Sequence, residues 1–237
     1  MSLPQILISV SALSLLLVVF AGIVAKKRYA TTVVFATYIA LVFSTDLLML
    51  AWPGTFYTTG FYALKEDVIN GLRFAVALEM SYRIFRAFPT AKQTARRVLR
   101  VLLAATLVAV LFATADAVDA PALLDRVQPR VVSASVWLFT ALAGLILWYR
   151  LPVDAFQKAI LVGWVPYLLV FSAALTYVGS HISQLPDANN RIIEITNYVH
   201  TLAYLGLLVF WARAAWAPAG VRVSAAKPAV ALQSSAG

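Results

Sequence analysis

The chain has 237 residues, of which 62% are hydrophobic and 12% are charged, and its mean hydropathy is +0.85. A soluble domain carries about a quarter charged residues. This chain lacks the polar surface that a water-facing globule needs, so its composition predicts a membrane protein. It contains no cysteine and two histidines, which excludes disulfides, thiolate catalysis and cysteine-ligated metals. We therefore expect no cofactor and no metal site.

Seven apolar segments are long enough to cross a bilayer, and they predict an all-α membrane protein with a seven-transmembrane-helix bundle. We expect the first to be a retained helix rather than a signal peptide, because its basic run "KKR" follows the apolar stretch. The predicted domain is this bundle over 1–216, followed by a disordered cytoplasmic tail over 217–237. In chain order, the spans are 3–25, 31–52, 64–87, 99–118, 130–149, 155–179 and 191–215.

Basic residues are unevenly divided between the two sides of this predicted bundle. About 14 Lys and Arg lie on one side and about 4 on the other, and the richer side of a membrane protein is usually cytoplasmic. The net charge of +9 is therefore interpreted as an orientation signal and not as a nucleic-acid surface. The pattern predicts a multi-pass membrane protein with the N-terminus outside and the C-terminus cytoplasmic. The basic loop 92–100 is expected to face a cytoplasmic partner or anionic lipid.

The third span carries charged residues that are costly to hold in hydrocarbon. At a rise of about 1.5 Å per residue, Arg73 lies roughly 13 Å and Asp46 roughly 9 Å inside the outer boundary, so the two are predicted to pair. Asn70 shares a helix face with Arg73, and a second polar face lies on the last span. The candidate ligand-binding cluster is Asp46, Asn70, Arg73, Glu194, Asn197 and His200. Three interpretations remain open: a hydrogen-bond network that fixes packing, a ligand pocket, and a proton or ion relay.

Glu79 lies four residues before Arg83, so the two are predicted to form a structural ion pair on one face of the helix. Lys158, at the start of the sixth span, is a second possible partner. Pro166 is expected to kink the sixth span, because proline removes a backbone donor.

Several known classes of membrane protein are excluded. A retinal pump needs a lysine midway along its last helix, and "IIEITNYVHTLAYLGLLVFWA" has none. Zinc-dependent membrane hydrolases need three histidines, and only His181 and His200 are present. No phosphate-binding glycine loop and no catalytic motif is found, so no catalytic residue is assigned.

Three stretches carry a resemblance: "KKRYATTVVFATYIALVFSTDL", "ALEMSYRIFRAFP" and "NYVHTLAYLGLLVFW". With them the chain resembles a family of uncharacterised bacterial seven-transmembrane-helix proteins over most of 1–216. Its layout is similar to that of the membrane input modules of histidine kinases. The resemblance implies the seven-helix fold and a place in the bacterial inner (cytoplasmic) membrane, and it brings no activity with it. Because the chain stops after the seventh span, any signalling output would need a separate partner.

These observations favour a sensor-like or accessory subunit that binds a small or lipophilic ligand or a membrane partner. Two alternatives remain: a structural subunit of a larger membrane complex, and a membrane-embedded enzyme acting on a lipid or isoprenoid substrate with Glu194 or His200 as base. The expected partners are the lipid bilayer and a membrane or cytoplasmic protein, with no nucleic acid. The oligomeric state is left open.

Overall fold

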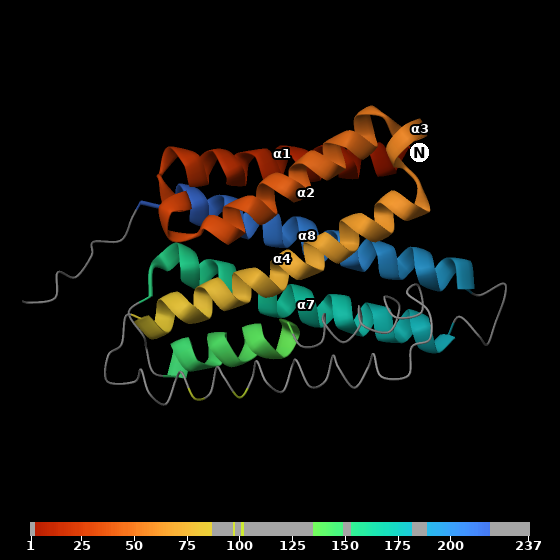
Figure 1. Cartoon of the computed structure of the whole chain (residues 1–237). Helices are drawn as coiled ribbons and strands as arrows, with labels where there is room; N and C mark the ends of the chain where they lie inside the picture. The colour runs from red at the N-terminus through yellow and green to blue at the C-terminus, as the bar shows by residue number, and fades with distance from the viewer. Residues whose placement is uncertain are drawn as a thin grey trace, which may run out of the picture.

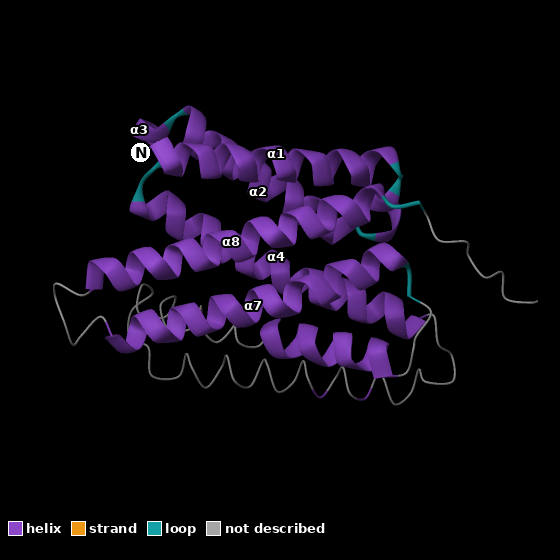
Figure 2. Cartoon of the chain, turned by 180° about the vertical axis from the view of Figure 1, so that it is seen from behind, coloured by secondary structure: helices purple, strands orange, loops and turns teal. Residues whose placement is uncertain are grey.

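The structure is a computed structural model that describes residues 3–86, 97, 101, 135–148, 153–181 and 189–218. Throughout these ranges the chain is helical, with short turns and no strand, as Figures 1 and 2 show from opposite sides. The all-α fold class is confirmed for this part of the chain.

The described helices agree with six of the predicted spans, and the predicted span 99–118 lies almost entirely outside the described residues. The helix within 64–87 begins five residues early, at Thr59. A short helix, α3, follows α2 and begins with Pro53. Proline is tolerated there because the first N–H of a helix has no partner within the helix. The elements are α1 (Leu3–Ala25), η1 (Arg28–Thr31), α2 (Val33–Ala51), α3 (Pro53–Phe56), α4 (Thr59–Arg86), an unlabelled helix Ser135–Trp148, α7 (Ala155–His181) and α8 (Asn189–Trp216).

Four of these helices are long and apolar enough to cross a membrane. Their spanning windows are apolar overall, yet only between 22% and 50% of each window is buried inside the molecule. A helix that exposes so much apolar surface needs a nonaqueous environment. The chain is therefore suited to a membrane through Ile6–Ala25, Val33–Ala51, Ala155–Ala174 and Glu194–Trp216.

Two other described helices differ from these four. Helix α4 has 28 residues, so its length suffices, but its many charged residues lower its hydropathy. The other is apolar, and its described part, Ser135–Trp148, is shorter than the four. The seven-span count and the orientation thus stay predictions.

The described helices contact one another in sequence: α7 packs against α8, α8 against α1, α1 against α2, and α2 against α4. In Figure 1, α4 runs diagonally across the bundle, and the N-terminus and α3 lie at the same end. The core contains a group of fully buried aromatic rings in edge-to-face contact. Phe35 of α2 lies 4.9 Å from Trp211 of α8, and Trp211 lies 5.2 Å from Trp164 of α7. This aromatic core joins α2, α7 and α8 and fixes the helices that carry the candidate site.

Candidate functional site

The central residue of the candidate site is Arg73, on the buried face of α4. Its side chain is 6% exposed, and that of Asn70, one turn earlier, is 5% exposed. The Arg73 Nη1 donates a hydrogen bond of 2.8 Å to the Asn70 Oδ1. The Arg73 Nε and the Asn70 Nδ2 are buried and have no hydrogen-bond partner among the residues that the structure describes. Two donor nitrogens are thus held away from water without an acceptor in the described part of the chain.

Aromatic side chains from α7 and α8 surround this pair of residues. The Arg73 guanidinium lies 5.8 Å from the centre of the Phe171 ring, within cation–π range. Phe171 packs against His200 of α8, with 5.0 Å between ring centres. The Tyr167 hydroxyl and the His200 Nε2 share a hydrogen bond of 3.0 Å. We call Asn70, Arg73, Tyr167, Phe171 and His200 the Arg73 cluster.

The charge of Arg73 has no counter-ion in contact. Within the described part of the chain, no carboxylate lies within ion-pair distance of its guanidinium. Glu66, an acid on the same helix, lies seven residues earlier, roughly 10 Å along the helix axis. A buried cation without a contacting anion is unfavourable, and the partners that compensate for it are hydrogen-bond acceptors and anions.

Three of the six residues predicted for the ligand-binding cluster come together in the structure: Asn70, Arg73 and His200. The predicted pair between Asp46 and Arg73 is not formed, because Lys65 Nζ binds Asp46 Oδ1 instead. Lys65 lies two turns nearer the start of α4 and reaches Asp46 with its flexible stem.

Glu194 and Asn197, the other two predicted residues, are exposed on α8. They do not contact the Arg73 cluster. Their spacing places both on one face of α8, as predicted. In the bundle this face points outward.

Tyr167 and Phe171 were not predicted as site residues. They are four residues apart on α7, so both point to one side of that helix and stack at 6.2 Å. An aromatic pair with this spacing next to Pro166 was the available signal. It is also the pattern of ordinary core packing, and only the tertiary structure shows that it faces a buried arginine.

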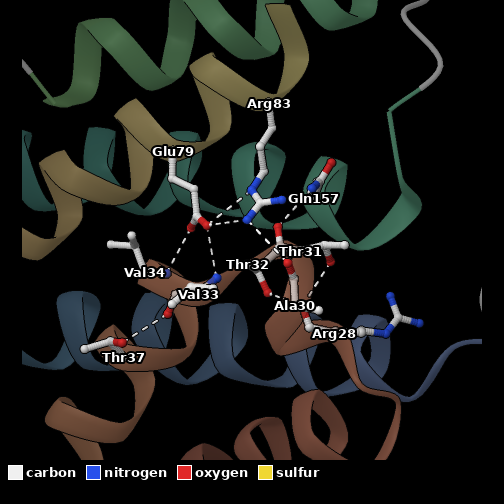
Figure 3. Close-up of polar contacts among 10 residues, drawn as sticks. All are labelled: Arg28, Ala30, Thr31, Thr32, Val33, Val34, Thr37, Glu79, Arg83 and Gln157. Atoms are coloured by element: carbon white, nitrogen blue, oxygen red, sulfur yellow. Dashed lines mark hydrogen bonds and ion pairs between the residues drawn. The ribbon is translucent and has the colours of Figure 1, made fainter. Parts of the chain in front are cut away.

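The predicted ion pair between Glu79 and Arg83 is confirmed, with an N–O distance of 3.1 Å. Lys158 is not its partner. The Glu79 carboxylate also accepts hydrogen bonds of 3.0 Å from the backbone N–H groups of Val33 and Val34, as Figure 3 shows. These are the first residues of α2, and Thr32, the N-cap residue, makes no side-chain cap bond. Glu79 therefore caps α2 from another helix.

The segment from Lys26 to Thr32, which we call the α1–α2 turn, is bound by three other helices. Arg83 of α4 and Gln157 of α7 donate hydrogen bonds to the carbonyl oxygens of Ala30 and Thr31, at 3.4 and 3.1 Å (Figure 3).

The same turn also contacts the end of α8 and the start of α7 through one arginine. Arg28 donates to the carbonyl oxygen of Ala217, just after α8, and lies 3.8 Å from the Asp154 carboxylate. Its guanidinium also lies 4.9 Å from the Phe156 ring centre. These contacts indicate a structural role for the turn.

Comparisons with protein-family models, with curated proteins and with solved structures found no match. Among the described residues, no group of three or more potential ligands is placed to hold a metal ion. The function is therefore argued from the Arg73 cluster alone, and the resemblance to bacterial seven-helix proteins stays a prediction.

Proposed function

We propose that the chain is a multi-pass protein of a bacterial inner membrane, with seven spans, an external N-terminus and a cytoplasmic C-terminus. It acts as a sensor-like or accessory subunit that binds a small or lipophilic anionic ligand at the Arg73 cluster. The observation that supports this is the unpaired state of the Arg73 Nε–H and the Asn70 Nδ2 in a buried, aromatic-walled position.

A ligand with acceptor oxygens supplies what these donors lack. A hydrogen bond to a charged group contributes about 1.5–3 kcal/mol, and leaving such a donor buried and unpaired is costly. A ligand that binds here also contacts α4, α7 and α8 together, because the cluster draws residues from all three. The bound ligand therefore favours the arrangement of α4, α7 and α8 in which the side chains of the cluster contact the ligand most closely. That change in packing is the signal passed to a partner protein.

The test is native mass spectrometry of the protein extracted in lipid discs, comparing wild type with Arg73→Gln. Arg213→Gln is the matched control, since Arg213 is exposed in the last turn of α8. We expect a bound mass of small-molecule size in wild type and in Arg213→Gln, and its loss from Arg73→Gln. If all three proteins carry the same mass, or none carries one while Arg73→Gln lowers only the thermal stability, Arg73 is a packing residue and the proposal fails.

A further inference from the structure

A groove lies between α7 and α8 within the two segments suited to crossing a membrane. Its volume is about 340 Å³, and small residues on both helices create the hollow. An added Cβ at Gly206 would meet no atom within 4 Å, so this position is open space. The lining is Val162, Gly163, Pro166, Tyr167, Val170, Ala203, Gly206, Leu207 and Phe210.

The groove is almost wholly apolar, and its exposed wall includes Pro166 and Phe210. At this level of the spanning segments the surrounding medium is hydrocarbon and not water. The occupant must therefore be soluble in the bilayer. A flexible hydrocarbon chain matches both the lining and the surroundings.

Tyr167 connects this groove with the Arg73 cluster. It is part of the groove wall, its hydroxyl bonds to His200, and its ring stacks on Phe171, which faces Arg73. The side chains of Tyr167 and Phe171 thus lie between the groove and Arg73. A molecule with a polar head and an apolar chain can use both places if these two rings turn aside.

The charge of the cluster indicates which head group fits. Arg73 is the one cation in the cluster, and Asn70 adds only neutral N–H groups, so a singly charged anion is balanced and a doubly charged phosphate is not. The Arg73 Nε–H and the Asn70 Nδ2–H are two separate donors. A carboxylate has two acceptor oxygens, and its pairing with guanidinium is geometrically favourable.

We propose that the ligand is a long-chain carboxylate taken from the bilayer, with its chain in the α7–α8 groove and its carboxylate at Arg73 and Asn70. This inference rests on the proposed function and adds the class of ligand and its route. In the described structure the two unpaired donor atoms are buried and the Tyr167–His200 hydrogen bond is formed. It breaks when the head group enters.

The experiment measures binding of labelled oleate to the protein in lipid discs, above a blank of empty discs. Gly206→Leu fills the groove at a position with open space, so the variant is expected to fold. Gly144→Leu is the matched control, because it is equally open and lies on another helix. We expect oleate binding at least tenfold weaker in Gly206→Leu and in Arg73→Gln, and unchanged in Gly144→Leu. Oleyl alcohol, with the same chain and no charge, and butyrate, with the charge and a short chain, should compete poorly.

The outcomes separate the two proposals. If Gly206→Leu binds oleate as wild type does while Arg73→Gln does not, the groove is not the chain site, and the proposed function stands. If oleyl alcohol competes as well as oleate, the carboxylate assignment is wrong. If Arg73→Gln binds oleate normally, the assignment of a long-chain carboxylate to Arg73 is overturned. The native mass measurement then decides the proposed function independently.

Discussion

Glu79 stabilises two elements with one carboxylate. It neutralises Arg83 on its own helix, and it accepts hydrogen bonds from the first two backbone N–H groups of α2. A carboxylate at a helix N-terminus is also favoured by the helix dipole. Glu79 therefore forms an ion pair on its own helix and also caps the N-terminus of the neighbouring helix α2.

Glu79→Ala should lower the free energy of unfolding by about 2–3 kcal/mol, since it leaves two backbone donors without their acceptor. Arg83→Ala should cost under about 1 kcal/mol, because the Arg83 side chain is 32% exposed and water replaces its partner. Thermal or SDS-induced unfolding in mild detergent measures both. Equal losses in the two variants would mean that the ion pair, and not the cap, is the main contribution.

The residue scale also shows where inference from sequence ends. The pair Glu79–Arg83 was predictable, because spacing of four fixes two side chains on one helix face. The cap on Val33 and Val34 was not, since it depends on where α4 crosses α2. The predicted pair Asp46–Arg73 is absent for the same reason. Depth in the membrane follows from position along a helix, but a contact also depends on the rotation of each helix about its axis. In the structure Lys65, and not Arg73, reaches Asp46.

At the scale of elements, glycines allow α8 to approach its two neighbours. At Gly163 of α7 an added Cβ would lie 2.9 Å from Leu207 Cδ1 and from Trp211 Nε1. At Gly22 of α1 it would lie 2.9 Å from the Ala215 Cβ and from the Trp216 Nε1. Both glycines therefore set the distance between helices.

Gly163→Ala should destabilise the protein by about 1–3 kcal/mol, because the methyl group overpacks the contact between α7 and α8. Gly206→Ala is the control on the facing helix. Its Cβ enters open space, and alanine is favoured over glycine in a helix by about 1 kcal/mol, so stability should stay level or rise. The measurement is the midpoint of thermal unfolding in detergent. A neutral Gly163→Ala would show that α7 and α8 can move apart without loss.

The helices themselves were largely predictable from sequence, and their surroundings were not. Apolar length identified six described helices to within a few residues at most ends, because hydrophobic runs bounded by charge or proline have few alternatives. Which face of each helix is buried depends on the partner helix. Glu194 and Asn197 show this, since they share one face of α8 as predicted, but that face is exposed.

For the whole molecule, orientation is the property to measure. The chain has no cysteine, so a single introduced one reports its own accessibility. With the predicted topology, a membrane-impermeant maleimide should label Gly60→Cys in intact spheroplasts and label Lys26→Cys only after permeabilisation. Both positions are exposed in the structure. Labelling of both variants in intact spheroplasts, or the reverse order, would contradict the assigned sides.

The α1–α2 turn has a further consequence for biosynthesis. The ribosome delivers this turn early, yet its partners arrive much later: Arg83 with α4, Gln157 with α7 and the Ala217 carbonyl after α8. Until then water is the only partner of these polar backbone groups, so the first hairpin lacks the contacts that fix its turn. The arrival of α8 and Ala217 therefore completes the contacts of the turn, and a chain that terminates before α8 should be degraded rather than accumulate as a stable fragment.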